Sequence, residues 1–260
     1  MSTLCITRDG PVARIYLNRP DVRNAFNDSV IAELKAAFDV FATDASLRAI
    51  VLGGHGKAFC AGADLNWMRG MADYDWDRNH QDAGALADML WSVYQCPVPV
   101  IGRLHGDCYA GGVGLAACCD IVVAAEGMHF CLSEARLGLS PATISPYVIR
   151  ALGRQASRRF FMTAERFSAV RAHELGFVQE LCAPGDLDRK VDELVGLLVA
   201  NGPTATRASK RLVQDFADLP IDEDVRDETA RRIADIRAGA EGKDGVQSFL
   251  AKRPASWLLS

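Results

Sequence analysis

The chain has 260 residues, of which 49% are hydrophobic and 24% charged, and its formal net charge is −4. A composition this close to the globular average excludes collagen, coiled-coil and disordered proteins, and the length suits one large domain or one domain with a small appendage. Nucleic-acid-binding and membrane-surface proteins are usually basic, so the charge disfavours both kinds of partner.

The N-terminal segment lacks the basic start and apolar core of a signal peptide, and no apolar run reaches the roughly 18 residues of a membrane span. The eight cysteines include no C-x-x-C pair and lie in apolar stretches. This usage is typical of buried free thiols. We therefore expect a cytoplasmic protein without disulfides.

Over its first two thirds the chain alternates short apolar strands with amphipathic helices. Strands are predicted over residues 12–18, 49–53, 98–104 and 121–125. Helices are predicted over residues 28–41, with Asn27 or Asp28 as the N-cap, and over residues 82–94. This alternation predicts an α/β core with largely parallel strands.

After about residue 153 the strand patterns nearly disappear. Residues 187–198 keep the helical period, and the tail from about 203 is helix-rich and heavily charged. We therefore predict an α/β domain over residues 1–200 and a helical region over residues 201–260.

Most familiar catalytic motifs are absent. The sequence has no G-x-S-x-G, H-E-x-x-H, G-x-x-x-x-G-K-[ST] or G-x-G-x-x-G motif, and its five histidines are isolated, so no metal site is predicted. Two glycine-bearing segments follow predicted strands, at residues 58–64 and 106–114. Such segments let a ligand approach the backbone, and two of them together would offer two N–H groups to one oxygen, as in an oxyanion hole. Two ordinary strand-to-helix turns would have the same appearance.

Several motifs follow one another in a fixed order along the chain. They are Leu17-Asn18-Arg19-Pro20, Phe59-Cys60-Ala61-Gly62-Ala63-Asp64, His105-Gly106, Ala110-Gly111-Gly112, Cys119-Asp120-Ile121 and Asn201-Gly202-Pro203. Together they resemble the crotonase (enoyl-CoA hydratase/isomerase) superfamily, over nearly the whole chain. The resemblance implies an α/β spiral of ββα turns with a helical C-terminal trimerisation region, assembled as a homotrimer or a dimer of trimers.

The resemblance also implies the residues of the site. The substrate would be an acyl-CoA thioester, whose carbonyl oxygen accepts hydrogen bonds from the N–H groups of Ala63 and Gly111, with no cofactor other than the coenzyme A of the substrate itself. Residues that would contact this substrate are Ala61, Gly62, Asp64, Trp67, Gly112 and Gly114. In the tail, Phe249 and Lys252 would approach the coenzyme A of an adjacent subunit, although Lys252 could equally be a solvated helix charge.

The carboxylates distinguish the possible reactions. Hydratases of this family typically use two glutamates, and the matching positions here are Gly114 and Glu134. Glu134 lies in a largely apolar stretch, where desolvation would raise its pKa and suit it to proton transfer. Either Glu134 acts alone as base and acid, or another group supplies the second function, or the reaction needs one carboxylate.

The segments around Gly114 and Glu134 resemble a bacterial subgroup that hydrates 3-methylglutaconyl-CoA or isohexenylglutaconyl-CoA. Those substrates carry a second carboxylate, for which the candidate cations are Arg69, Arg78 and Arg136. The alternatives are a single-glutamate enoyl-CoA isomerase, a non-catalytic acyl-CoA binder and an RNA-binding homologue; the acidic net charge disfavours the last.

Overall fold

The structure is a computed structural model that describes residues 2–259. The chain divides into two compact units, Met1–Glu193 and Leu194–Ser260. This division falls within helix α8 (Leu187–Ala200), whereas the boundary predicted from the sequence lies at the end of that helix.

The first unit contains two sheets. The six-stranded sheet has the order β1 (Leu4–Asp9), β2 (Val12–Leu17), β3 (Ala49–Gly54), β5 (Val100–Leu104), β7 (Ile121–Ala125) and β10 (Glu180–Cys182). The four-stranded sheet has the order β4 (Ala58–Cys60), β6 (Asp107–Tyr109), β8 (His129–Cys131) and β9 (Arg166–Ser168). Among the strand pairs within residues 2–259, only β1–β2 and β8–β9 are antiparallel. The prediction of largely parallel strands is therefore confirmed.

Successive pairs of strands supply one strand to each sheet before the chain enters a helix, as in β3–β4 and β5–β6. This repeat is the predicted ββα spiral. Helices of the first unit are α1 (Asp28–Thr43), α2 (Leu65–Met71), α3 (Trp76–Gln95), α4 (Gly111–Ala117), α5 (Ser145–Leu152), α6 (Arg154–Thr163), α7 (Ala169–Glu174) and the first half of α8. Short 3₁₀ turns are η1 (Pro20–Val22), η2 (Glu134–Leu137) and η3 (Pro184–Asp186).

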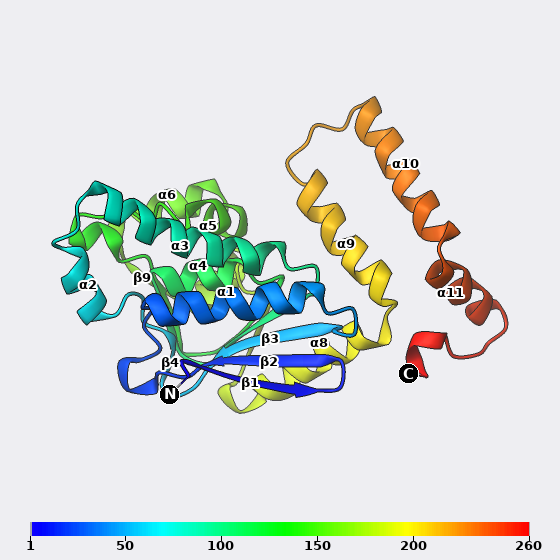
Figure 1. The fold of residues 1–260 in the computed structure, drawn as a ribbon, viewed down its shortest axis with the longest axis horizontal. Coiled ribbons are helices and arrows are strands. Elements are labelled where there is room, and N and C mark those ends of the chain that lie inside the picture. The colour runs from blue at the N-terminus through cyan, green and yellow to red at the C-terminus, as the bar shows by residue number, and fades with distance from the viewer. Residues whose placement is uncertain (1, 260) are drawn as a thin grey trace. The chain divides into compact units, whose positions relative to one another are not determined.

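Helix α1 begins where the sequence predicts. The Asn27 side chain accepts a hydrogen bond from Val30 N, and the helix buries Val30, Ile31, Leu34 and Phe38. Each such burial contributes about 1.5–3 kcal/mol. Figure 1 shows α1 and α3 side by side above the six-stranded sheet. Their apolar faces close the core over the strands.

Two expectations about local structure are wrong. Helix α3 begins at Trp76 rather than at residue 82, because Asp75 caps it by accepting from Arg78 N. Strands β9 and β10 follow residue 153, where strands were expected nearly to vanish. They have three residues each, which is too short for a period-2 pattern to be visible.

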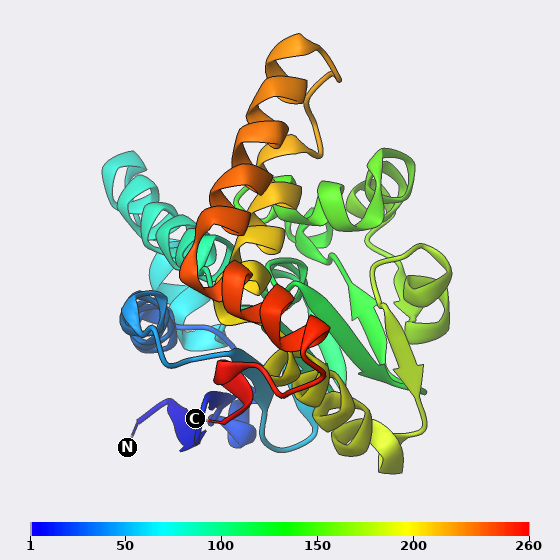
Figure 2. The ribbon, with the colours of Figure 1, turned by 90° about the vertical axis from the view of Figure 1, so that its right-hand side faces the viewer.

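The second unit is helical and contains α9 (Pro203–Phe216), α10 (Glu223–Ala238), α11 (Ala240–Leu250) and the 3₁₀ turn η4 (Ser256–Leu258). Figure 2 shows α9 and α10 side by side. Arg232 of α10 links them, because its guanidinium pairs with Asp215 at 2.7 Å and lies over the Phe216 ring at 4.6 Å.

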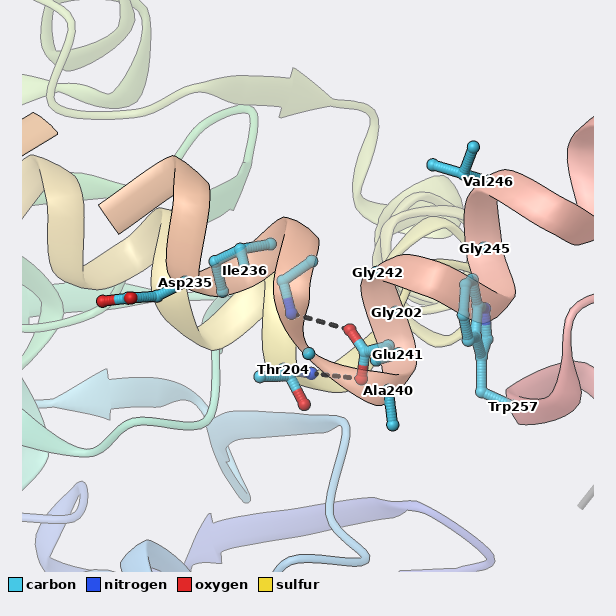
Figure 3. A pocket seen from close by; sticks show the side chains of 12 residues that line it. Gly202, Thr204, Asp235, Ile236, Ala240, Glu241, Gly242, Gly245, Val246 and Trp257 are labelled. Atoms are coloured by element: carbon cyan, nitrogen blue, oxygen red, sulfur yellow. Dashed lines mark hydrogen bonds between the residues drawn. The ribbon is translucent and has the colours of Figure 1, made fainter. Parts of the chain in front are cut away.

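A pocket of about 570 Å³ lies within the second unit, between Gly202, Glu241, Gly245 and Trp257 among others. The Glu241 carboxylate caps α9, accepting from Thr204 N and Ala205 N at 2.9 Å each, as Figure 3 shows. A carboxylate at a helix N-terminus satisfies free N–H groups and complements the helix dipole. The pocket lining includes none of the predicted site residues.

Candidate active site

Two backbone segments leave the four-stranded sheet at the same edge. Strands β4 and β6 are parallel neighbours, so the segments that follow them, residues 61–64 and 110–114, lie close together. At Gly62, whose φ is +93°, an added Cβ would lie 3.2 Å from Ala110 Cβ and 3.5 Å from Tyr109 O. Glycine suits both this conformation and this close approach. The structure thus brings together the two segments that the sequence singled out.

Two N–H groups at this junction have no acceptor among residues 2–259. Ala63 pairs with Phe26 in a parallel bridge, in which Phe26 N–H donates to Gly62 O at 2.7 Å and Asp64 N–H donates to Phe26 O at 2.8 Å. This pattern turns the Ala63 N–H away from Phe26. Gly111 is the first residue of α4, where N–H groups lack an intrahelical acceptor. Both residues are partly exposed.

The start of α4 is held by close packing. Added Cβ atoms at Gly111 and Gly112 would lie 3.1 Å from Phe26 Cδ2 and 2.8 Å from Cys60 Cβ. The preceding residue, Ala110, has φ 48° and ψ −120°, a strained conformation for a residue with a side chain. Such strain costs about 1–3 kcal/mol and persists where the surroundings impose it. The geometry of the Gly111 N–H is therefore set by tertiary packing.

Glu134 follows β8, the parallel neighbour of β6 in the four-stranded sheet. It opens the 3₁₀ turn η2, two residues after the buried Leu132. Its Oε2 is buried without a hydrogen-bond partner in the described chain, and burial raises the pKa of the carboxyl group. A desolvated carboxylate with one oxygen free of hydrogen bonds is ready to exchange a proton with a ligand.

The second carboxylate position holds Gly114, in α4. An added Cβ there would lie 2.1 Å from Ile144 Cγ2, so the side chain of Ile144 already fills this space. Neither Ile144 nor Phe26 was given a site role from the sequence, because contacts between residues so far apart leave no local pattern.

Asp64 has a structural task that the sequence did not reveal. Its side chain is 7% exposed and pairs with Arg19 at 2.8 Å. It also caps α2, accepting from Asn66 N at 2.8 Å and Trp67 N at 3.4 Å. The Arg19 guanidinium and these N–H groups outweigh the desolvation of the carboxyl group and lower its pKa. Both carboxylate oxygens of Asp64 therefore already have partners, and a substrate that contacts this side chain, as the sequence predicts, would have to compete with them.

The remaining predicted contacts are distributed around α2 and η2. Ala61 N–H donates to Arg23 O at 3.0 Å. Trp67 packs against the core, and its Nε1 donates to Asp82 Oδ1 at 3.2 Å.

The candidate cations differ in their partners. Arg69 is exposed and donates to Asn66 on its own helix at 2.7 Å. Arg78 lies over the Tyr74 ring at 5.3 Å. Arg136 is exposed on η2 beside Glu134, and the structure gives it no ion pair with any residue it describes. The structure therefore leaves Arg136 the least engaged of the three.

In the second unit, Phe249 lies near the C-terminal end of α11 and is 81% exposed. Lys252 is also exposed, two residues beyond the helix, with φ 53°.

Other chemistry finds little support at this junction. Burial raises the pKa of the Cys60 thiol to about 12, so it stays protonated and is a poor nucleophile. All eight cysteines are free thiols. Within the described residues, no cluster of three His, Cys, Asp or Glu side chains is arranged to hold a metal ion. Across residues 2–259, no helix is both long and apolar enough to cross a membrane.

Comparison with known proteins places this geometry in a family. The sequence profile described as "Enoyl-CoA hydratase/isomerase" matches residues 7–258. A putative enoyl-CoA hydratase of Thermus thermophilus is 31% identical over 94% of this chain and 96% of its own length. The 2,3-dehydroadipyl-CoA hydratase of Escherichia coli is 30% identical over 97% of both chains.

Solved structures agree with the sequence comparison. An enoyl-CoA hydratase from Shewanella pealeana superposes with a TM-score of 0.95 at 40% identity, covering 98% of this chain and 96% of that one. Pseudomonas aeruginosa AtuE superposes with a TM-score of 0.94 at 34% identity, covering 98% and 99%. The protein is thus an acyl-CoA hydro-lyase with the crotonase fold, and it belongs to the enoyl-CoA hydratase/isomerase family.

Proposed function

We propose that this enzyme hydrates an enoyl-CoA whose acyl group carries a second carboxylate, of the 3-methylglutaconyl-CoA or isohexenylglutaconyl-CoA type. The observation that carries the chemistry is the buried, unpartnered Oε2 of Glu134 in a site whose other carboxylate position is Gly114. The Escherichia coli relative is named for 2,3-dehydroadipyl-CoA, the thioester of a dicarboxylic acid. This name supports the same class of substrate here.

In the proposed mechanism, the thioester oxygen accepts hydrogen bonds from Ala63 N–H and Gly111 N–H. Each donor lowers the barrier by about 3–4 kcal/mol as negative charge develops on that oxygen. Ionised Glu134 takes a proton from water while the water oxygen bonds to Cβ of the enoyl group. The enolate then takes the proton from Glu134 at Cα. Glu134 returns to its ionised form, so one carboxylate serves as base and then as acid.

Binding follows from the same geometry. No cofactor is needed beyond the coenzyme A of the substrate. Arg136 is our candidate for the substrate carboxylate because its guanidinium, unlike those of Arg69 and Arg78, makes no hydrogen bond or ring contact within the described chain. Arg136→Ala should raise KM for the dicarboxylate substrate much more than for crotonyl-CoA. Equal effects on both substrates would remove Arg136 from the site.

We further propose a homotrimer or a dimer of trimers, in which Phe249 and Lys252 of one tail approach the coenzyme A of an adjacent subunit. The exposure of Phe249 supports a partner for this end of α11. Sedimentation analysis measures the assembly, and a monomer that is active at all concentrations would contradict it.

The test of the function is hydration of 3-methylglutaconyl-CoA and crotonyl-CoA by the wild type and by Glu134→Gln. A strong preference for the dicarboxylate that the variant abolishes supports both the substrate class and the role of Glu134. Activity that survives in the variant assigns the chemistry to another residue.

A single-glutamate isomerase is the second candidate, because moving one proton between two carbons needs only one carboxylate and Gly114 leaves only Glu134. Product analysis separates the two reactions. Hydration consumes the absorbance of the conjugated enoyl thioester, whereas conversion of a β,γ-enoyl to an α,β-enoyl thioester creates it.

A further inference from the structure

The packing around Gly114 leaves no room for any side chain. A Cβ on Gly114 would lie 2.1 Å from Ile144 Cγ2 and 2.5 Å from Ile144 Cβ. Real Cβ atoms essentially never approach other heavy atoms so closely. Gly114 is itself buried, and Ile144 is 3% exposed. The glycine is therefore part of a packed contact between α4 and the start of α5.

Ile144 is fixed at this place by its surroundings. It is the residue immediately before α5, and its carbonyl accepts Val148 N–H at 3.1 Å in the first turn. Its side chain belongs to the hydrophobic core of the first unit. Close-packed cores do not open by several tenths of an ångström without cost. A residue larger than glycine at position 114 would consequently displace either Ile144 or the start of α5.

We propose that Ile144 is a specificity-determining residue, which closes the second carboxylate position and so keeps the site free of a charge that would repel the carboxylate of the substrate. This inference rests on the proposed function. Two like charges about 8 Å apart, at an effective dielectric constant of about 20, change an equilibrium about 30-fold. Because Gly114 and Ile144 carry no charge, a dicarboxylate acyl group should bind more favourably here than in a site with a second glutamate at position 114.

The test combines a steric and an electrostatic comparison. Gly114→Glu and Ile144→Ala are made singly and together, and Gly114→Gln with Ile144→Ala is the matched control of the same size without the charge. Melting temperatures are measured for all variants. The ratio of kcat/KM for 3-methylglutaconyl-CoA to that for crotonyl-CoA is measured for the wild type and both double variants.

We expect Gly114→Glu alone to lower the melting temperature, and the added Ile144→Ala to recover part of the loss. The specificity ratio should fall about 30-fold in the Gly114→Glu double variant relative to the Gln double variant. Equal ratios in the two double variants would overturn the electrostatic role. A Gly114→Glu variant as stable as the wild type would overturn the steric one.

Failure of the proposed function gives a different result. In that case the wild type itself shows no preference for the dicarboxylate substrate. The melting temperatures still decide whether Ile144 closes position 114, because they do not depend on which substrate the enzyme uses.

Discussion

Replacing Glu134 by glutamine tests the central chemical claim with the smallest change in shape. General acid–base catalysis by a positioned side chain contributes about 10²–10⁴-fold, which corresponds to about 3–5 kcal/mol in the barrier. Because Gly114 supplies no second carboxylate, we expect the loss in kcat to lie at the upper end of this range. KM should change little, since the N–H groups of Ala63 and Gly111 remain in place.

The same variant makes a prediction about stability. Burial raises the pKa of Glu134 above the ordinary value of a glutamate, so folding favours the protonated form. The stabilising contribution of the protonated group is complete below the unfolded-state pKa and is lost as the pH rises through the folded-state pKa. At about pH 8 the wild type therefore holds an ionised carboxylate at a cost that glutamine avoids. The melting temperature of Glu134→Gln should equal or exceed that of the wild type at this pH, and the difference should shrink in acid.

Hydration kinetics and thermal unfolding across pH measure both effects. Glu174→Gln is the control, because Glu174 is an exposed glutamate paired with Arg171 on α7; its kcat should equal that of the wild type. In the wild type, kcat/KM should rise with pH through a pKa above the usual glutamate range. A Glu134→Gln variant with wild-type kcat, or one that unfolds much more readily at about pH 8, would refute this reasoning.

Three further predictions concern the backbone around the site. Asp64→Ala removes the α2 cap and leaves Arg19 unpaired, so the free energy of unfolding should fall by about 2–4 kcal/mol in urea titrations. Asp64→Asn keeps a cap, so its free energy of unfolding should fall by less. Equal losses in the two variants would contradict this prediction. Ala110→Gly relieves the φ of 48° and should raise stability by about 1 kcal/mol; a lower melting temperature would show that Ala110 is not strained. Gly62→Ala should lower kcat/KM about 100-fold, because its Cβ would press on Ala110; unchanged kinetics would separate this junction from catalysis.

Much of the fold was predictable because its signals are local. The helix over α1 and its Asn27 cap follow from apolar spacing and a single side chain. Strand β7 was predicted with its observed bounds, since a buried strand is a short apolar run. Strands β4, β6 and β8 were not predicted, because three residues carry too little pattern and their pairing is decided by partners elsewhere in the chain.

The sequence by itself determined the class of protein, the two glycine-bearing segments and the candidate glutamate. Ordered motifs and local periodicity are patterns of neighbouring residues, so they can be recognised in the sequence alone. Only the tertiary structure decided that Asp64 is engaged by Arg19 and that Ile144 fills the space over Gly114. These contacts join residues distant in the chain, and their energies depend on distances of a few tenths of an ångström, which no local pattern records.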